Sequence, residues 1–291
     1  MGRRSHKKRA KHGTFFRRTP PGATPGTLVA DPEAPHPAIR LIAYGPQDVL
    51  ERDIQDPREI GAYLGRWPVV WVNVDGLGDV KTIQQIAEVF SLHPLALEDV
   101  VNVHQRPKLE AYGPQHFIVA REVTLDGRLE TEQISLFLGK NFLVTFQEFP
   151  GDCLDPVRER IRKVQGRHRS AGPDYLAYSI LDAIIDGYFP VLETLGEKLE
   201  SLEDDIVQKA SDQTVISRIH GVKRDLLTVR RAIWPFREAG NSLFREPSPR
   251  VTDETRLYLR DCYDHTIQLI DLLETYREVA GGLVDVYLSS V

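Results

Sequence analysis

The sequence predicts an α+β protein: an α/β/α sandwich, then an antiparallel helical hairpin and one long C-terminal helix. Short runs rich in β-branched and aromatic residues are concentrated in the first half of the chain. The second half instead repeats its apolar residues at helical spacing. Residues 251–291 contain no proline and predict one helix about 60 Å long at the usual rise per residue.

Composition limits the class of protein. The chain has 291 residues, enough for one large domain or for one domain with an elongated helical part. Its hydrophobic fraction of 41% and charged fraction of 27% are typical of a soluble globular protein. The two distant cysteines, Cys153 and Cys262, fit a reducing cytosol and argue against a structural zinc site. No uninterrupted run of 18 apolar residues occurs, so we expect no membrane span within these residues.

Residues 1–26 predict a basic, disordered arm. The first twenty residues hold only basic charges, and prolines follow them. The arm has no apolar core of the kind found in a signal peptide, which argues against export. It could contact anionic lipid or nucleic acid, or act only as a solubilising tail; we expect no nucleic-acid partner.

Residues 27–170 predict the α/β domain. Strands are expected at 39–44, 69–74, 117–123, 133–138 and 142–146. Gly139-Lys140-Asn141 predicts a hairpin between the last two. Residues 80–91 predict a helix, His93-Pro94 begins a shorter one, and Asp155-Pro156 begins a basic one.

Residues 171–249 predict the helical hairpin. One helix is expected over 174–209, with a bend at Pro190 and an acidic second half. A basic helix is expected from an N-cap at Asp212 to Trp234-Pro235, and the charges of the two helices could pair. Pro247 and Pro249 then separate the hairpin from the terminal helix, residues 250–291.

The terminal helix carries acids at strict seven-residue spacing: Asp264, Asp271, Glu278 and Asp285. Small or polar residues run beside them, and an apolar row that includes Leu272, Val279 and Val286 is expected on the opposite side. A seven-residue repeat keeps one stripe facing one partner when helices supercoil, although the same stripe could simply face solvent. The chain ends at Ser289-Ser290-Val291 without a Gly or Pro stop, so we expect it to be cut within a longer helix.

No common catalytic motif is present: the sequence has no Walker loop, no GxGxxG after a strand, no nucleophile elbow and no HExxH. Carboxylates remain as candidates for chemistry. Glu98 and Asp99 are adjacent, and the pairs Asp182/Asp186 and Asp261/His265 lie four residues apart on one helix face. Such oxygen-rich groups suit Mg²⁺, which keeps most of its water. Spacing alone is weak support, because acids on helices usually face solvent.

Several motifs resemble the cytoplasmic domain of CorA magnesium/cobalt transporters. They are LHPLALEDVVNVHQRPK at 92–108, FQE at 146–148, DPVRERIR at 155–162, YDHTIQ at 263–268 and DVYLSSV at 285–291. The resemblance extends in the same order from about Pro20 onward.

The resemblance implies a homopentamer at the cytoplasmic face of the cell inner membrane. The terminal helix of each subunit, the stalk helix of this family, would continue into the first of two membrane spans. Neither those spans nor the family's Gly-Met-Asn selectivity loop is among these residues. Asp99 of one subunit and Asp261 of its neighbour would share a regulatory Mg²⁺. Glu98, Asp182 and His265 would be outer or second-site ligands. Asp285 would form an acidic ring in the pore, preceded by Asp271 and Glu278.

The resemblance therefore implies a metal-sensing and gating domain for Mg²⁺ and Co²⁺, not an enzyme, in which bound Mg²⁺ holds the closed state. The related zinc transporters are an alternative within the superfamily. A metal-dependent hydrolase would need two ions about 3.5–4 Å apart beside a base, and no such grouping stands out. A plain coiled-coil scaffold is a further alternative. The sequence does not decide between Mg²⁺, Co²⁺, Ni²⁺ and Zn²⁺.

Overall fold

The structure is a computed structural model that describes residues 19–208, 213–245, 248 and 250–290. Most of the predicted basic arm, the expected cap Asp212, and the breaks Pro247 and Pro249 lie outside these residues. The described chain divides into two compact units. One holds the residues up to Gln105 with 112–117 and 133–173, and the other holds 106–111, 118–132 and everything after residue 173.

Seven strands follow the sheet order β2-β1-β3-β7-β6-β5-β4. Their bounds are β1 Ala38–Tyr44, β2 Val49–Ile54, β3 Val69–Asp75, β4 Lys108–Tyr112, β5 Gln115–Asp126, β6 Arg128–Leu138 and β7 Phe142–Gln147. All five predicted strands are present, and β2 and β4 are additions. β1 is antiparallel to β2 and β3, β3 runs parallel to β7, and β7 is antiparallel to β6.

The central strands β3 and β7 are buried almost throughout, as expected for continuous apolar runs inside a sheet. The predicted hairpin joins β6 to β7, where the backbone N–H of Gly139 donates to the carbonyl of Phe142. A Cβ at residue 139 would lie 2.2 Å from the Phe142 ring, so this turn requires glycine.

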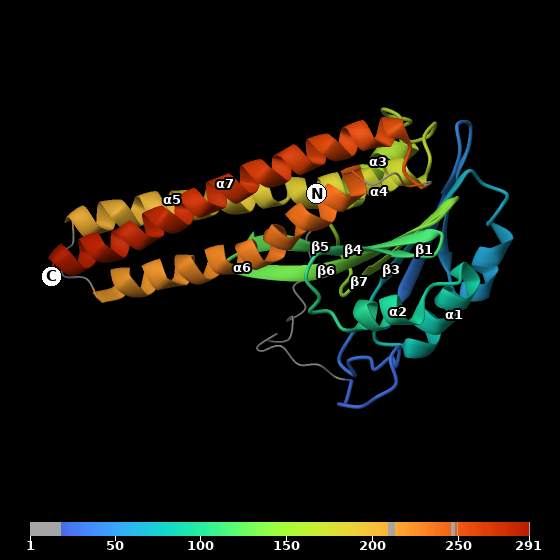
Figure 1. Cartoon of the computed structure of the whole chain (residues 1–291), viewed down its shortest axis with the longest axis horizontal. Helices are drawn as coiled ribbons and strands as arrows, with labels where there is room; N and C mark the ends of the chain where they lie inside the picture. Colours follow the sequence, from blue (N-terminus) through green and yellow to red (C-terminus); the bar gives the residue numbers. More distant parts are fainter. Residues whose placement is uncertain (1–18, 209–212, 246–247, 249, 291) are drawn as a thin grey trace. The chain divides into compact units, whose positions relative to one another are not determined.

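Helices α1 (Val80–Phe90) and α2 (Pro94–Val101) lie on one side of these strands, and α3 (Asp155–Arg162) lies on the other (Figure 1). Local chemistry sets their starts. Asp79 caps α1, and Nδ1 of His93 accepts from the backbone N–H of Leu95 at the start of α2. The 3₁₀ helix η1 (Pro57–Ala62) begins at a capping aspartate, Asp56. The α+β fold class is confirmed.

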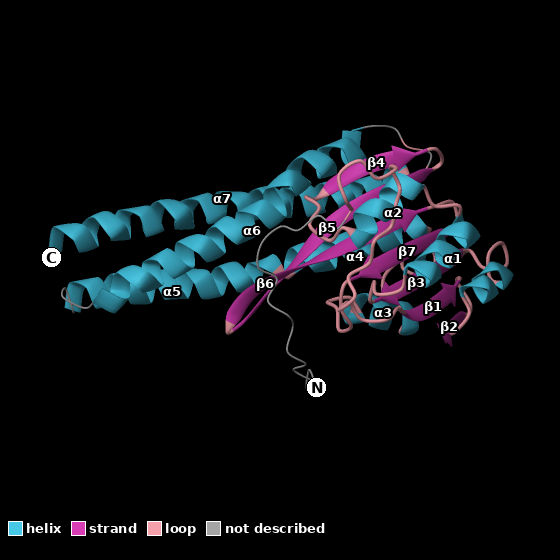
Figure 2. Ribbon diagram, turned by 90° about the horizontal axis from the view of Figure 1, so that it is seen from below, coloured by secondary structure: helices cyan, strands magenta, loops and turns pink. Residues whose placement is uncertain are grey.

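Most of the second unit is helical. Helix α4 covers Pro173–Asp186, α5 Tyr188–Gln208, α6 Gln213–Arg245 and α7 Asp253–Ser290. Helices α5 and α6 run antiparallel, and α7 lies along both of them (Figure 2). The expected four-segment division of the chain, at residues 26, 170 and 249, stays a prediction.

Two expected helix features are wrong. The break between α4 and α5 falls at Gly187 rather than at Pro190. Pro190 sits in the first turn of α5, where its missing N–H has no helical partner to lose. Helix α6 also continues through Trp234-Pro235 to Arg245, with Pro235 in its interior. Packing of a long apolar face therefore outweighs the lost hydrogen bond at Pro235.

Among the described residues, the stretch 173–207 passes a length and composition test for a membrane span, with a mean hydropathy of 1.2 in its most apolar window. However, 61% of that window is buried inside the structure. A core helix meets the same criteria, so this is weak support for a span.

Candidate metal site between α4 and α7

Helices α4 and α7 bring together three groups that can bind a cation. One oxygen each of Asp182 and Asp186 and one ring nitrogen of His265 all lie within 4.8 Å of one another. Asp182 and His265 are half-buried, and Asp186 is exposed. The Nδ1 atom of His265 is buried and has no hydrogen-bond partner among the described residues. Two carboxylates and an imidazole with an unpartnered buried nitrogen are a donor set that fits a divalent cation.

Aromatic packing holds the two helices in this register. The rings of Tyr175 and Tyr178 on α4 contact Tyr258 on α7, with centroids 5.2 and 5.3 Å away. At the start of α7, Thr252 donates both its backbone N–H (2.9 Å) and its hydroxyl (2.8 Å) to Oδ2 of the buried Asp174. The His265 ring meets Phe189 edge-on, with centroids 6.0 Å apart.

Carboxylates lie around the buried Cys262 next to the site. Burial, and then the carboxylates of Asp182, Asp186 and Asp261, raise the pKa of the Cys262 thiol well above its ordinary value. Burial and Asp182 likewise raise the pKa of the Tyr178 hydroxyl. Both groups therefore stay protonated near neutral pH. A bound cation would offset the negative charge of the carboxylates.

Three of the five predicted metal ligands lie in this unit. Asp182 and His265 are brought together, and Asp261 lies one turn earlier on α7 with an exposed side chain. The ligand set implied by the resemblance did not include Asp186, although its spacing of four from Asp182 had marked the pair as a candidate.

Glu98 and Asp99 lie in the other unit, on α2. Both are half-buried. Oε2 of Glu98 accepts from the backbone N–H of Gly26 at 2.9 Å, and the backbone carbonyl of Asp99 accepts from Nε2 of Gln133 at 2.8 Å. These bonds fix the last turns of α2. The ligand roles assigned to Glu98 and Asp99 stay predictions.

The predicted pore-lining acids share one exposed row along α7. Asp264, Asp271, Glu278 and Asp285 are all exposed, as are the small and polar Gln268, Thr275, Gly282 and Ser289. The buried row runs through Thr266, Leu269, Leu273, Ala280, Leu283 and Tyr287. Val279 and Val286 were expected on the buried side, but they are 40% and 51% exposed, because each follows directly after an acid of the exposed row.

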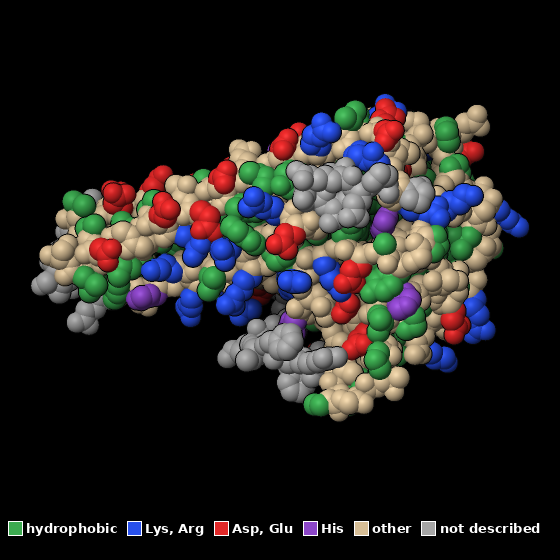
Figure 3. All heavy atoms as spheres, viewed as in Figure 1, with side chains coloured by type: hydrophobic (Ala, Val, Ile, Leu, Met, Phe, Trp, Pro, Cys, Tyr) green, Lys and Arg blue, Asp and Glu red, His purple; other side chains and the backbone are tan. Residues whose placement is uncertain are grey.

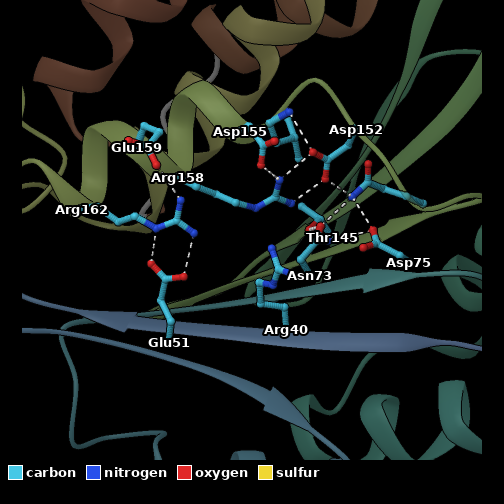
Figure 4. Close-up of polar contacts among 12 residues, drawn as sticks. Arg40, Glu51, Asn73, Asp75, Thr145, Asp152, Asp155, Arg158, Glu159 and Arg162 are labelled. Carbon is cyan, nitrogen blue, oxygen red and sulfur yellow. Dashed lines mark hydrogen bonds and ion pairs between the residues drawn. The ribbon is translucent and has the colours of Figure 1, made fainter. Parts of the chain in front are cut away.

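The first unit contains a second polar cluster, between the sheet and α3 (Figure 4). Arg158 of α3 is buried and donates to both carboxylate oxygens of Asp152, at 2.6 and 2.5 Å. Nε2 of Gln147 donates to Asp152 and to Asp75. Burial, and then Asp152, raise the pKa of Asp75 to about 6. Because Asp152 is engaged by Arg158 and Gln147, this cluster fits attachment of α3 to the sheet better than binding of a metal.

Comparison with known proteins identifies the family. A family model described as a CorA-like Mg²⁺ transporter protein matches residues 68–291. The chain belongs to this family. Its members are metal ion transporters and not enzymes, so the hydrolase alternative is excluded.

Two bacterial relatives are more than 30% identical to this chain. The chain is 42% identical over 274 residues to the cobalt/magnesium transport protein CorA of Thermotoga maritima, which covers 93% of this chain and 78% of that protein. It is 32% identical over 221 residues to the putative metal ion transporter YfjQ of Bacillus subtilis, which covers 75% of this chain and 67% of that protein.

Solved structures share the fold. The soluble domain of CorA from Methanocaldococcus jannaschii matches with a TM-score of 0.73 at 22% identity, over 87% of this chain and 97% of that one. The ZntB cytoplasmic domain from Vibrio parahaemolyticus matches with a TM-score of 0.65 at 13% identity, over 85% and 95%. Because both match, the fold alone does not separate the two kinds of transporter. The family model and the 42% identity favour the CorA side.

Proposed function

We propose that this chain is the cytoplasmic metal-sensing part of a homopentameric CorA-type channel for Mg²⁺ and Co²⁺. Family membership supports divalent-cation transport. The observation that supports sensing is the cluster of Asp182, Asp186 and His265, in which the imidazole also has a buried, unpartnered Nδ1. The channel would lie in the cell inner membrane, with this part on its cytoplasmic face.

Two kinds of binding are compatible with the ligand set. Mg²⁺ would bind through one or two carboxylates and keep most of its water, which gives the weak affinity needed to report a millimolar concentration. Co²⁺ would gain more from the imidazole. The same imidazole suits Zn²⁺, so a zinc transporter remains the second candidate.

The regulatory Mg²⁺ would bridge Asp99 of one subunit and Asp261 of its neighbour, with Glu98 beside it. The exposed position of Asp261 on α7 supports this role, because a neighbouring chain could reach it. When internal Mg²⁺ falls, the emptied carboxylates would repel one another and favour the open state.

The exposed acids of α7 would face the axis of the pentamer. Five copies of Asp264, Asp271, Glu278 and Asp285 would form stacked negative rings that concentrate hydrated cations. The small residues between the acids, among them Thr275 and Gly282, would leave the passage open.

Thermal melting tests the sensing role. Mg²⁺ that binds only the folded protein stabilises it, by about 1.4 kcal/mol at ten times its dissociation constant. We expect the melting temperature to rise from zero to tens of millimolar Mg²⁺, and to rise less with NaCl at matched ionic strength. A curve that stays flat with Mg²⁺ and with Co²⁺ contradicts metal sensing by this part of the chain.

A further inference from the structure

Helix α5 carries an exposed acidic row. Glu193, Glu197, Glu200 and Asp204 follow one another at spacings of four, three and four residues, so their side chains share one face. All four are exposed, and Glu203 is exposed beside them. None of these acids makes an ion pair with any other residue in the described part of the chain. We call this face the acidic row.

Helix α6 carries an exposed basic row at the same spacing. His220, Arg224, Leu227 and Arg231 are separated by four, three and four residues, and Lys223 is exposed next to them. Leu227 is 38% exposed, which places an apolar side chain in the middle of the basic row. In Figure 3, Lys and Arg side chains gather along α6, and Asp and Glu side chains lie along α7.

Most charges of the two rows make no ion pair within the described part of the chain. The expectation that the hairpin pairs its charges is met by Arg218, which bonds Asp205 across α5 and α6 at 2.5 Å. Arg230 turns instead to Glu274 of α7 at 2.9 Å and stacks over Trp234. Lys223, Arg224 and Arg231 make no ion pair with the residues that the structure describes, so for most of these charges the expectation is wrong.

We propose that the basic row of α6 docks against the acidic row of α5 in a second copy of this chain. Each row covers twelve residues, whose eleven steps extend about 16 Å at the helical rise, so the two match in length. Their spacing of four and three residues keeps each row on one face of its helix, so the two rows can face each other along their whole length. Leu227 would lie against the aliphatic parts of the α5 side chains, between the charges of its own row.

Charge complementarity favours a second copy over an anionic membrane. A membrane would attract the basic row but would repel the acidic row, which the same hairpin carries. It also favours α5 over α7 as the partner, since the exposed row of α7 alternates its acids with neutral residues and the row of α5 is acidic throughout.

The contact joins different faces of the two copies, so it is heterologous, and repetition of such a contact closes a ring when the rotation allows. The inference uses only the homo-oligomer from the proposed function and does not involve the metal site. Loss of the docking contact therefore leaves metal binding at Asp182, Asp186 and His265 intact, because these three residues belong to one chain. Loss of metal binding at that cluster likewise leaves the docking contact intact.

Charge reversal tests the contact. One variant carries Lys223→Glu, Arg224→Glu and Arg231→Glu; the other carries Glu197→Lys, Glu200→Lys and Asp204→Lys. Single exposed pairs contribute little, so three charges are reversed together. We expect each variant to weaken self-association about ten-fold in sedimentation velocity runs, with an unchanged melting temperature. We also expect the wild-type chain to dissociate as salt rises.

Recombination separates docking from general charge effects. The two triple variants mixed together should co-assemble, and one chain with all six changes should self-associate again. Reversal of the exposed Lys81 to Glu and Glu88 to Lys on α1 serves as the control and should leave this contact unchanged. Wild-type association of both triple variants, failure of the mixture to assemble, or a wild-type chain that stays monomeric up to about 100 µM overturns the proposal. A further result would also overturn it: the α6 triple variant no longer binds anionic vesicles, while the α5 triple variant self-associates like the wild type. The basic row would then bind a membrane and not a second copy.

Discussion

The hydroxyl of Tyr276 on α7 lies so close to Gly196 on α5 that a Cβ at residue 196 would sit 2.5 Å from it. This contact sets how closely the two helices approach, because the ring carbon behind the hydroxyl would lie only 2.8 Å from the same Cβ. A glycine in the middle of a long helix costs stability, and its position against Tyr276 gives a packing reason for it.

We predict that Gly196→Ala lowers the free energy of unfolding by about 1–2 kcal/mol, because the ring of Tyr276 must move. Gly221 on α6 is the matched control, since nothing lies within 4 Å of a Cβ added there. Gly221→Ala should raise the free energy of unfolding by up to about 1 kcal/mol. Urea denaturation measures both. Equal effects of the two substitutions contradict the packing argument, and Tyr276→Leu should largely rescue Gly196→Ala.

The second prediction concerns pH. The pKa of Asp75 is about 6 in the fold, above its ordinary value of 3.8, so the folded state holds this proton more tightly than the unfolded state. The contribution of protonated Asp75 to the free energy of unfolding is fully present below about pH 4 and is lost as pH rises through 6. Asp75→Asn should therefore stabilise the protein by up to about 3 kcal/mol at pH 7.5 and have little effect near pH 4. Asp53→Asn, at an exposed neighbouring carboxylate, is the control. A pH-independent difference between Asp75→Asn and wild type is the contrary result.

The third prediction concerns the metal ligands. Asp186→Asn and His265→Ala should each weaken Co²⁺ binding at least about ten-fold, as judged by the visible absorption of the bound ion, because each removes one ligand of the cluster. Asp264→Asn is the matched control: it removes an exposed acid on the same helix, outside the cluster. If the control loses as much affinity as the other two variants, the effect is one of net charge and not of ligation.

The fourth prediction concerns the proposed intersubunit bridge in the full-length transporter. Asp261→Lys should place an ammonium where the shared Mg²⁺ would sit and so make the contact with Asp99 independent of the ion. Mg²⁺ inhibition of flux should become weak. Asp99→Ala should also weaken it, by loosening the contact. Wild-type inhibition in both variants shows that another site senses Mg²⁺.

Much of the fold could be predicted because β3, β7 and the long helices carry uninterrupted patterns. The unpredicted strands are polar ones near the edges of the sheet: β2 reads VLERDI and β4 reads KLEAY. Such strands gain most of their stability from pairing with a neighbour, which a local pattern does not reveal. The helix break at Gly187 was also hidden, because Pro190 was the stronger local signal but lies where a helix tolerates it.

The candidate site was predictable in parts. The pairs Asp182/Asp186 and Asp261/His265 follow from spacing, but their meeting depends on how α4 packs against α7 through the tyrosines 175, 178 and 258. Sequence reasoning also paired the hairpin charges within the chain. Exposure along α5 and α6 depends on which faces α7 covers, and that is a property of tertiary packing.

The seven-residue repeat of α7 applies to both of its rows, the buried one and the exposed one. The angular offset between the rows therefore stays nearly constant along the helix, so any rotation of α7 about its own axis would turn both rows together. A rotation that begins beside Asp261 would reach Asp285, about 36 Å further along, with little loss of angle. Gly281 and Gly282, which have open space around them, lie just before that end. They are where such torsion is most easily absorbed, so substituting alanine for both would couple the two ends of α7 more tightly.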